Sequence, residues 1–330
     1  MPIHNTAPKH LRVAIESILK QTFTNFEFVI LNDSPQNQEI KLIVKSYNDS
    51  RIRYEENPQT LGIACSYNRL IELAKCDFIA IMNHDDCSLP NRLEIQYQYL
   101  QKHPKVGIVG SGYKKFGEIN RFKKVSPPTR DADIRSMLLF KSSIHHPTIM
   151  MRKSLLDEKN IRYNENYVSL NDRQLYYDLS KHCKLANIST ILYKYRFHKN
   201  MTSKTKKDMI FAEQCEFHNY WFNDNNIKLS PTEKSVFDYF ASSGRSRIKD
   251  IHTLNAIKDV LEKISQQSVD SPNIPHPEFS NICARYLLKR TLNAAVYGRI
   301  NSDKILQNTS LPIKADFRIK LLNLALKWRA

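Results

Sequence analysis

The sequence predicts an α/β fold with a parallel, doubly wound sheet, followed by a helical region. Apolar runs alternate with amphipathic helical patterns over residues 1–205, the order that builds parallel strands with helices on both faces. Two of the runs, residues 26–31 and 78–82, are followed closely by carboxylates. Because ligands bind beyond the carboxyl ends of strands in such sheets, we expect the functional site at these two ends.

The elements are expected in close succession. Pro8 suits an initial turn, and apolar residues recur after it at helical spacing, which predicts a first helix at residues 8–19. Further helices are expected at residues 36–47, 62–74, 90–100, 131–140 and 170–183, with another beginning at Leu155. Strands are expected at residues 26–31, 51–55, 78–82, 106–110, 149–151 and 188–196. The predicted domains are residues 1–205 and a mainly helical, aromatic-rich region at 206–330, with a linker near 266–278.

The chain is strongly basic. It has 50 Lys and Arg against 33 Asp and Glu, a formal net charge of +17, which favours a polyanionic partner such as nucleic acid, anionic lipid or a phosphorylated ligand. The six cysteines form no CxxC pair, so neither a zinc ribbon nor a disulfide framework is indicated. No apolar run approaches the roughly 20 residues of a membrane span, and no signal-peptide pattern begins the chain, so we expect a cytoplasmic location.

Asp85 and Asp86 are the first candidates for chemistry, because they follow the apolar run at residues 78–82. Two adjacent carboxylates repel each other unless they are solvated or a cation lies between them and an anionic ligand. A solvated pair that caps the following helix is the structural alternative, and spacing alone leaves both open. Asp172 at a predicted helix start and His198 after a predicted strand have similar alternatives, a helix-dipole contact and a surface position.

Seven separate motifs follow one another along residues 1 to about 200. They are Met1-Pro2-Ile3-His4-Asn5, the helix-like stretch at 14–23, Leu31-Asn32-Asp33-Ser34, Asn83-His84-Asp85-Asp86, Arg92-Leu93-Glu94 with His103-Pro104, His146-Pro147-Thr148, and Tyr195-Arg196-Phe197-His198. Together they resemble glycosyltransferase family 2, the inverting GT-A nucleotide-sugar transferases of bacterial polysaccharide synthesis.

The resemblance implies a GT-A fold, Rossmann-like with a mostly parallel central sheet, and a C-terminal helical extension. It implies a UDP-sugar donor, a saccharide or lipid-linked saccharide acceptor in lipooligosaccharide, capsule or related surface-glycan synthesis, and a divalent cation, Mn²⁺ or Mg²⁺. By resemblance Asp172 is the catalytic base, and Asp86 with His198 holds the metal, Asp86 being the first choice. The nucleotide-sugar-binding residues would be Pro2, Asn5, Asp33, Asn68, Asn83 and Asp85.

The sequence departs from the family pattern at several positions. Asn83 replaces the first aspartate of Asp-x-Asp, and Asn171 replaces the glutamate of a Glu-Asp pair. Fewer carboxylates predict weaker metal binding, or a contact from Asn83 to the nucleotide instead. Tyr67 stands where many relatives carry an arginine, which removes one cation from the pyrophosphate site. The first strand is expected to be nearly absent, which gives two hypotheses: a true start upstream of Met1, or an impaired enzyme.

Other classes of protein fit less well. A dehydrogenase would need a GxGxxG turn and a P-loop enzyme a GxxxxGK[ST] loop, and the chain has neither. A nucleotidyltransferase and a basic nucleic-acid-binding protein remain as alternatives. No recognition-helix or zinc-finger pattern accompanies the charge, so no nucleic-acid partner is expected.

The C-terminus predicts a membrane contact. Residues 281–330 carry ten Lys and Arg against two acids, a local net charge of +8. Four apolar residues lie at helical spacing near the end: Phe317, Leu321, Leu324 and Trp328. This layout is typical of an interfacial helix on anionic lipid, and equally of a basic helix that packs on the catalytic domain. With a lipid-linked acceptor, the expectation is a peripheral protein on the inner face of the cytoplasmic membrane.

Overall fold

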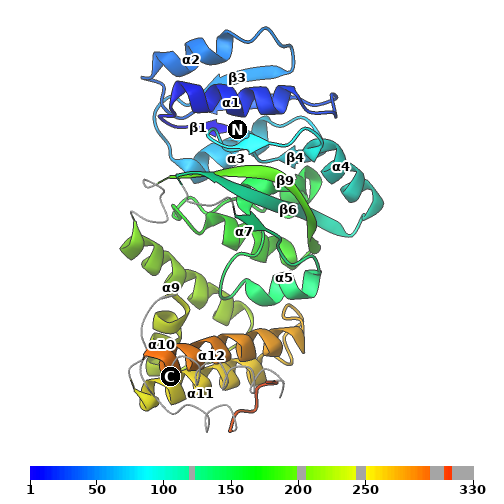
Figure 1. Cartoon of the computed structure of the whole chain (residues 1–330). Helices are drawn as coiled ribbons and strands as arrows, with labels where there is room; N and C mark the ends of the chain where they lie inside the picture. Colours follow the sequence, from blue (N-terminus) through cyan, green and yellow to red (C-terminus); the bar gives the residue numbers. More distant parts are fainter. Residues whose placement is uncertain (119–122, 199–205, 243–249, 298–307, 314–330) are drawn as a thin grey trace. The chain divides into compact units, whose positions relative to one another are not determined.

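The computed structural model describes residues 1–118, 123–198, 206–242, 250–297 and 308–313 (Figure 1). The chain forms two compact units. The first contains residues 1–134 and 142–210, and the second contains residues 135–141 and 211–330. The second unit therefore includes part of a helix from the middle of the chain, α5 (Asp131–Met137), as well as the C-terminal region.

The first unit begins with a small parallel sheet in the order β1-β2-β3. Its strands are β1 (Pro2–Ile3), β2 (Phe28–Asn32) and β3 (Ile52–Glu56), and the helices around it are α1 (Pro8–Leu19), α2 (Gln38–Lys45) and α3 (Ile63–Leu73). Every residue of β2 is buried, as its continuous apolar sequence predicts for a strand covered on both faces. The apolar faces of α1 and α2 share one core cluster with β2.

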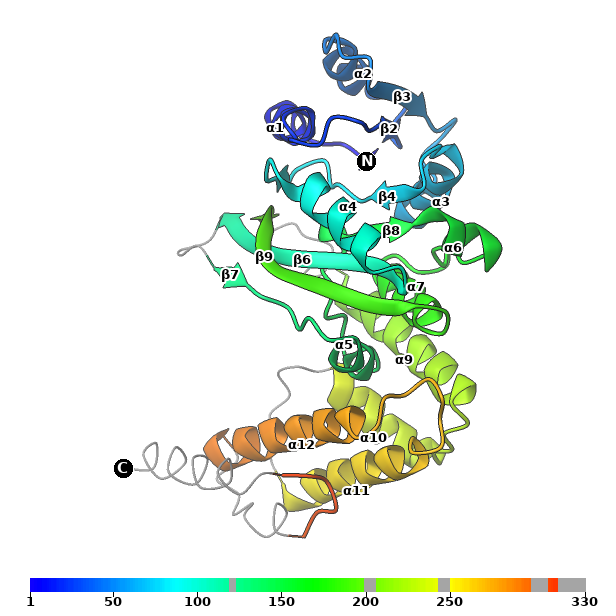
Figure 2. The ribbon, with the colours of Figure 1, turned by 90° about the vertical axis from the view of Figure 1, so that its right-hand side faces the viewer.

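A second, six-stranded sheet follows in the order β4-β8-β6-β9-β5, with β7 paired to β6 (Figure 2). Its strands are β4 (Phe78–Ala80), β5 (Cys87–Ser88), β6 (Val106–Gly117), β7 (Lys124–Val125), β8 (Met150–Arg152) and β9 (Lys184–Phe197). The helices between them are α4 (Arg92–Lys102), the 3₁₀ turn η1 (His146–Thr148), α6 (Lys153–Glu158) and α7 (Asn171–Ser180). Only β6 and β9 pair in parallel, so this sheet is mixed rather than mostly parallel.

The strand and helix order agrees with the prediction, with two short strands missed. β5 and β7 have two residues each, too few for an apolar alternation to reveal. β6 continues beyond its predicted run to Gly117, and β9 begins before its predicted run at Lys184, because the two strands pair with each other over these residues. No strand pairing joins the two sheets within the described part of the chain.

A buried polar pair holds α4 against the second sheet. The fully buried guanidinium of Arg92 donates to the carbonyl oxygens of Ile81 at 2.7 Å and Ile149 at 3.1 Å, and to the side chain of Gln96 at 2.9 Å. Gln96 in turn donates to Val109 O at 3.0 Å. Backbone carbonyls after β4, before β8 and within β6 are thus bonded from one helix, which fixes where the chain after β4 emerges.

The second unit is helical and has an aromatic core. Its helices are α9 (Lys207–Asp224, which starts in the first unit), α10 (Pro231–Ser242), α11 (Ile251–Gln267) and α12 (Glu278–Tyr297). Phe140 stacks on Tyr286 with ring centroids 4.1 Å apart, and Trp221 stacks on Phe279 at 5.6 Å. The predicted linker stretch connects α11 to α12 inside this unit. No described helix is both long and apolar enough to cross a membrane.

Candidate active site

A cavity of about 910 Å³ opens at the carboxyl ends of β1, β2 and β4. Seven of the nine residues expected in the site line it: Pro2, Asn5, Asp33, Asn83, Asp85, Asp172 and His198. Asn68 and Asp86 do not. The cavity is therefore built where the ends of parallel strands meet, as the fold class predicts.

Asp33 holds one wall of this cavity in place. Its carboxylate accepts hydrogen bonds from the Leu61 N–H at 2.8 Å, the Gly62 N–H at 3.0 Å and the Asn57 side chain at 2.6 Å. Gly62 has φ of +93°, a conformation that favours glycine, and it directly precedes α3. The Asp33 carboxylate is thus fixed in direction while part of it still borders the cavity, which suits a group that recognises a ligand's hydrogen-bond donors.

The side chains of the two adjacent aspartates after β4 lie in different environments. Asp86 is completely buried, and its carboxylate accepts from the Arg196 N–H at 2.6 Å, the Tyr193 hydroxyl at 3.0 Å and the Asn83 side chain at 3.1 Å. Burial, and next the negative charge of Asp85, raise the pKa of Asp86 well above its usual value. Asp86 therefore ties the loop after β4 to the end of β9.

Asp85 borders the cavity instead. Its side chain is 21% exposed, and its Oδ2 lies 3.6 Å from Nε2 of His198. The Arg196 side chain donates to the Asp85 carbonyl oxygen at 2.7 Å, which fixes the backbone on which this carboxylate sits. Asp85, and not Asp86, is thus the carboxylate that lines the cavity beside His198, and the metal-binding role expected of Asp86 stays a prediction.

Asn68 does not line the cavity either. Its side-chain amide donates to Tyr163 O and to Glu165, both at 2.9 Å, and its oxygen accepts from the Tyr163 N–H at 2.8 Å. These contacts join α3 to the loop before α7 and use the amide fully. Asn68 therefore holds the loop in position, and its expected contact with the nucleotide-sugar stays a prediction.

Asp172 lies at the first turn of α7, in a wall of aromatic rings. Burial raises the pKa of its carboxyl group to about 6, although its Oδ1 accepts from the Arg173 N–H at 2.7 Å. Tyr67 stacks on Tyr163 at 5.0 Å, and the Tyr163 hydroxyl lies 2.9 Å from Nε2 of His146. These rings exclude water on one side of Asp172, which leaves it as a carboxylate near neutral pH with a raised proton affinity.

Sequence reasoning missed part of the cavity wall. Glu165, Lys206 and the turn at Thr60 to Gly62 line it, and none belongs to a motif quoted above. The turn could have been suspected from the lone Gly62 before a helical pattern, but nothing nearby in the sequence marks Glu165 or Lys206.

The described residues offer a partial metal site. No group of three or more His, Cys, Asp or Glu among them is placed to hold a metal ion. Asp85 and His198 supply one carboxylate and one imidazole, a pair that fits a cation whose other ligands are phosphate oxygens and water. Such a site would bind metal together with a nucleotide rather than alone.

Comparison with known proteins identifies the family. Residues 1–159 match the family described as glycosyl transferase family 2. An uncharacterized glycosyltransferase of Methanocaldococcus jannaschii is 30% identical over 250 residues, which cover 72% of this chain and 84% of the relative. The chain belongs to glycosyl transferase family 2.

This family 2 glycosyltransferase is also similar to a second relative in sequence and to a solved structure in fold. The O-antigen biosynthesis glycosyltransferase WbnJ of Escherichia coli is 30% identical over 201 residues, covering 60% of this chain and 78% of WbnJ. The crystal structure of S. aureus TarS 1–349 in complex with UDP-GlcNAc superposes with a TM-score of 0.59 at 15% identity, covering 89% of this chain and 85% of that one. At this identity the likeness shows the fold alone, and it confirms the predicted GT-A class.

Removing the Asp86 side chain should destabilise this transferase much more than removing the Asp85 side chain. Asp86→Ala removes three buried hydrogen bonds, so we expect it to lower the free energy of unfolding by about 3 kcal/mol. Asp85→Ala changes a cavity-facing side chain and should stay within about 0.5 kcal/mol of the parent. Urea unfolding followed by circular dichroism measures both, and equal losses for the two variants would contradict the assignment.

Proposed function

We propose that this glycosyltransferase is a metal-dependent, inverting enzyme that moves a hexose or N-acetylhexosamine from a UDP-sugar to a saccharide acceptor. One observation carries the proposal. A single cavity brings together a fixed carboxylate at Asp33, the Asp85 and His198 pair, and Asp172 at the first turn of α7. These are the three kinds of group that nucleotide recognition, charge stabilisation and base catalysis require.

The donor is proposed to lie across the strand ends. Asp33 would accept hydrogen bonds from the uracil or ribose, since the carboxylate is already held in direction by backbone donors. The pyrophosphate would lie toward Asp85. Asp85 and His198 would hold a divalent cation there, which would offset the charge of the leaving nucleoside diphosphate. Lys206 lines the same cavity and adds a positive charge. Pro2, Asn5 and Asn83 would complete the donor contacts.

Asp172 is proposed as the base. The acceptor hydroxyl attacks the anomeric carbon from the side opposite the nucleotide, so the new oxygen–carbon bond forms as the bond to the diphosphate breaks, and the configuration inverts. The proton of the hydroxyl passes to the Asp172 carboxylate. The raised pKa of this group brings its proton affinity closer to neutral pH, which favours proton transfer in the transition state.

The donor and acceptor classes rest on the relatives as well as on the site. TarS has been crystallised with UDP-GlcNAc and with UDP, and WbnJ acts in O-antigen biosynthesis. These support a UDP-sugar donor and an acceptor saccharide of lipooligosaccharide, capsule or a related surface glycan. Donor recognition depends on the strand ends that build the cavity, whereas the acceptor would enter past Asp172 and the aromatic wall.

The proposal predicts how transfer depends on Asp172 and on pH. Release of UDP from a panel of UDP-sugars, measured with Mn²⁺ or Mg²⁺ and saccharide acceptors, should identify a substrate pair for the parent enzyme. Asp172→Asn should lower kcat at least about 100-fold and leave the donor KM nearly unchanged, because the amide cannot accept a proton.

The pH dependence of the parent enzyme is a second prediction. Since the active form is the carboxylate with a pKa of about 6, parent kcat/KM should fall about tenfold per pH unit below 6 and stay level above it.

Asp178→Asn is the matched control for this test. Asp178 lies on the same helix and pairs with Lys181 at 3.4 Å, so its loss should leave kcat within about twofold. A donor KM that rises sharply in Asp172→Asn with kcat preserved would move Asp172 to the nucleotide site and contradict its role as the base.

The membrane contact of the C-terminus also remains a proposal. The predicted interfacial helix at residues 312–330 lies almost entirely outside the described residues, whereas the start of the basic segment belongs to α12, where Phe279 and Leu287 are buried. Cosedimentation with anionic vesicles at low salt should be lost when residues 312–330 are removed, with UDP binding retained. Equal vesicle binding by the truncated protein would rule out this helix as the anchor.

A further inference from the structure

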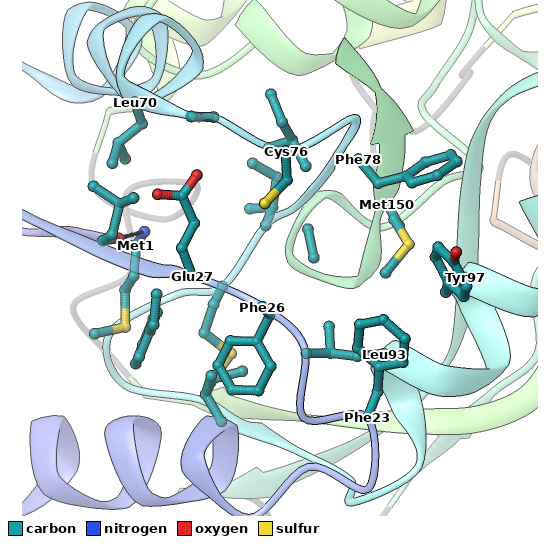
Figure 3. A pocket seen from close by; sticks show the side chains of 18 of the residues that line it. Met1, Phe23, Phe26, Glu27, Leu70, Cys76, Phe78, Leu93, Tyr97 and Met150 are labelled. Carbon is teal, nitrogen blue, oxygen red and sulfur yellow. Dashed lines mark hydrogen bonds between the residues drawn. The ribbon is translucent and has the colours of Figure 1, made fainter. Parts of the chain in front are cut away.

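Tyr67 of α3 lies outside the nucleotide and metal contacts proposed above, yet it lines two cavities. One is the active-site cavity. The other has a volume of about 400 Å³ and lies between the two sheets of the first unit, where Figure 3 shows Leu70 of the same helix. Most of the lining of this second cavity is apolar. Tyr67 is 4% exposed, so its ring is enclosed between an apolar cavity and a polar one.

The hydroxyl group of Tyr67 faces the active-site cavity. It donates to Oδ1 of Asn83 at 3.4 Å, and Asn83 lines the active-site cavity but not the second one. A distance of 3.4 Å is long for a hydrogen bond between two oxygen atoms. A hydroxyl offers one donor and two acceptor lone pairs, so this contact uses little of its capacity. The hydroxyl can therefore exchange it for a shorter hydrogen bond to a bound ligand.

This hydroxyl lies between the two ends of the proposed site. Its partner Asn83 belongs to the loop that carries Asp85, at the metal end. Burial raises the pKa of Tyr67 above its usual value. The negative charges of Asp172, Asp86 and Asp85 raise this pKa further, Asp172 the most. The proposed base and the metal end therefore both act on one hydroxyl, which stays protonated and can donate.

Neighbouring aromatic rings hold the Tyr67 side chain in place. Its ring stacks on Tyr163 with centroids 5.0 Å apart and meets His146 in a T-shaped contact at 4.8 Å. The His146 ring in turn lies 6.4 Å from that of Tyr176, which is fully buried on α7. Aromatic rings with a few fixed polar groups are a common lining of ligand sites, because the rings pack on apolar faces and the polar groups set the orientation. The C–H face of a sugar ring suits such a wall.

We propose that the Tyr67 hydroxyl donates to a hydroxyl group of the sugar being transferred and that this contact selects an uncharged hexosyl group. The inference rests on the proposed function. In an inverting displacement the acceptor oxygen, the anomeric carbon and the leaving oxygen are in line, so the sugar lies between the base and the metal end. The Tyr67 hydroxyl borders that position. The charges that act most on it are all negative, so a sugar carboxylate would be repelled there, whereas a sugar hydroxyl can accept.

Binding measurements with and without the sugar test this contact. The full chain with Mn²⁺ is titrated in a calorimeter with UDP, UDP-galactose, UDP-N-acetylglucosamine and UDP-glucuronate. Tyr67→Phe should weaken binding of the neutral UDP-sugar that the parent binds most tightly at least about fivefold, since one hydrogen bond to the sugar is lost. Its affinity for UDP should stay within about twofold of the parent, because UDP lacks the contacted sugar. The parent should bind UDP-glucuronate at least about tenfold more weakly than that neutral UDP-sugar.

Tyr176→Phe is the matched control. The Tyr176 hydroxyl is buried behind the same aromatic wall, has no hydrogen-bond partner among the described residues and does not line the active-site cavity. Removing it should leave the affinities for UDP and for the UDP-sugars within about twofold of those of the parent, because no ligand contact is lost.

The outcomes separate this inference from the function on which it rests. If the parent bound neither UDP nor any of the three UDP-sugars, the proposed function would be wrong and the inference would fall with it. If the parent bound them and Tyr67→Phe weakened UDP and the UDP-sugar equally, or neither, the sugar contact alone would be overturned. Equal affinity of the parent for UDP-glucuronate and the neutral sugars would overturn the selection of an uncharged group.

Discussion

The buried carboxylate of Asp86 is the contact on which the active site depends most. It joins the loop after β4 to β9 through the Arg196 N–H and the Tyr193 hydroxyl, and that hydroxyl also accepts from the Asn83 N–H at 3.3 Å. A carboxylate removed from water must be satisfied on most of its lone pairs, so these donors have little freedom to move. The direction of Asp85 follows from this arrangement, because its own carbonyl is bonded to the Arg196 side chain. Asp86 thus holds the loop on which Asp85 faces the cavity.

The remaining parts of the site are held by similar polar contacts at strand ends. Asp33 binds the turn before α3, and Arg92 with Gln96 binds the ends of β4 and the segment before β8. These contacts bond backbone groups of the turn before α3 and of the segments next to β4 and β8. The segments around the active-site cavity therefore have backbones that these hydrogen bonds hold in place. This is the preorganisation that charge stabilisation in a glycosyltransferase needs.

The sequence predicted the fold class, and seven of the nine residues that it indicated for the site line the cavity, because both predictions depend on local patterns. Apolar runs with polar ends located β2 and β4, and the motif order indicated the family. The roles of Asp85 and Asp86 could not be separated in the same way. Neighbouring residues after a strand point in different directions, and which one is buried is decided by Arg196, 110 residues further along the chain. Asn68 is a similar case, since its partner Tyr163 is 95 residues away.

The short first strand shows the same limit of local patterns. The sequence indicated that little of this strand is present, but the split into two sheets and the cavity between them depend on pairings of β2 and β4 with other strands.

We propose that Asp85 and His198, rather than Asp86, form the metal end of the donor site. Crystals grown with UDP and Mn²⁺ should show an anomalous scattering peak about 2.0–2.6 Å from an Asp85 oxygen and a His198 nitrogen, with Asp86 still bonded to the Arg196 N–H. A peak at Asp86, or UDP bound with the metal away from both Asp85 and His198, would contradict the account.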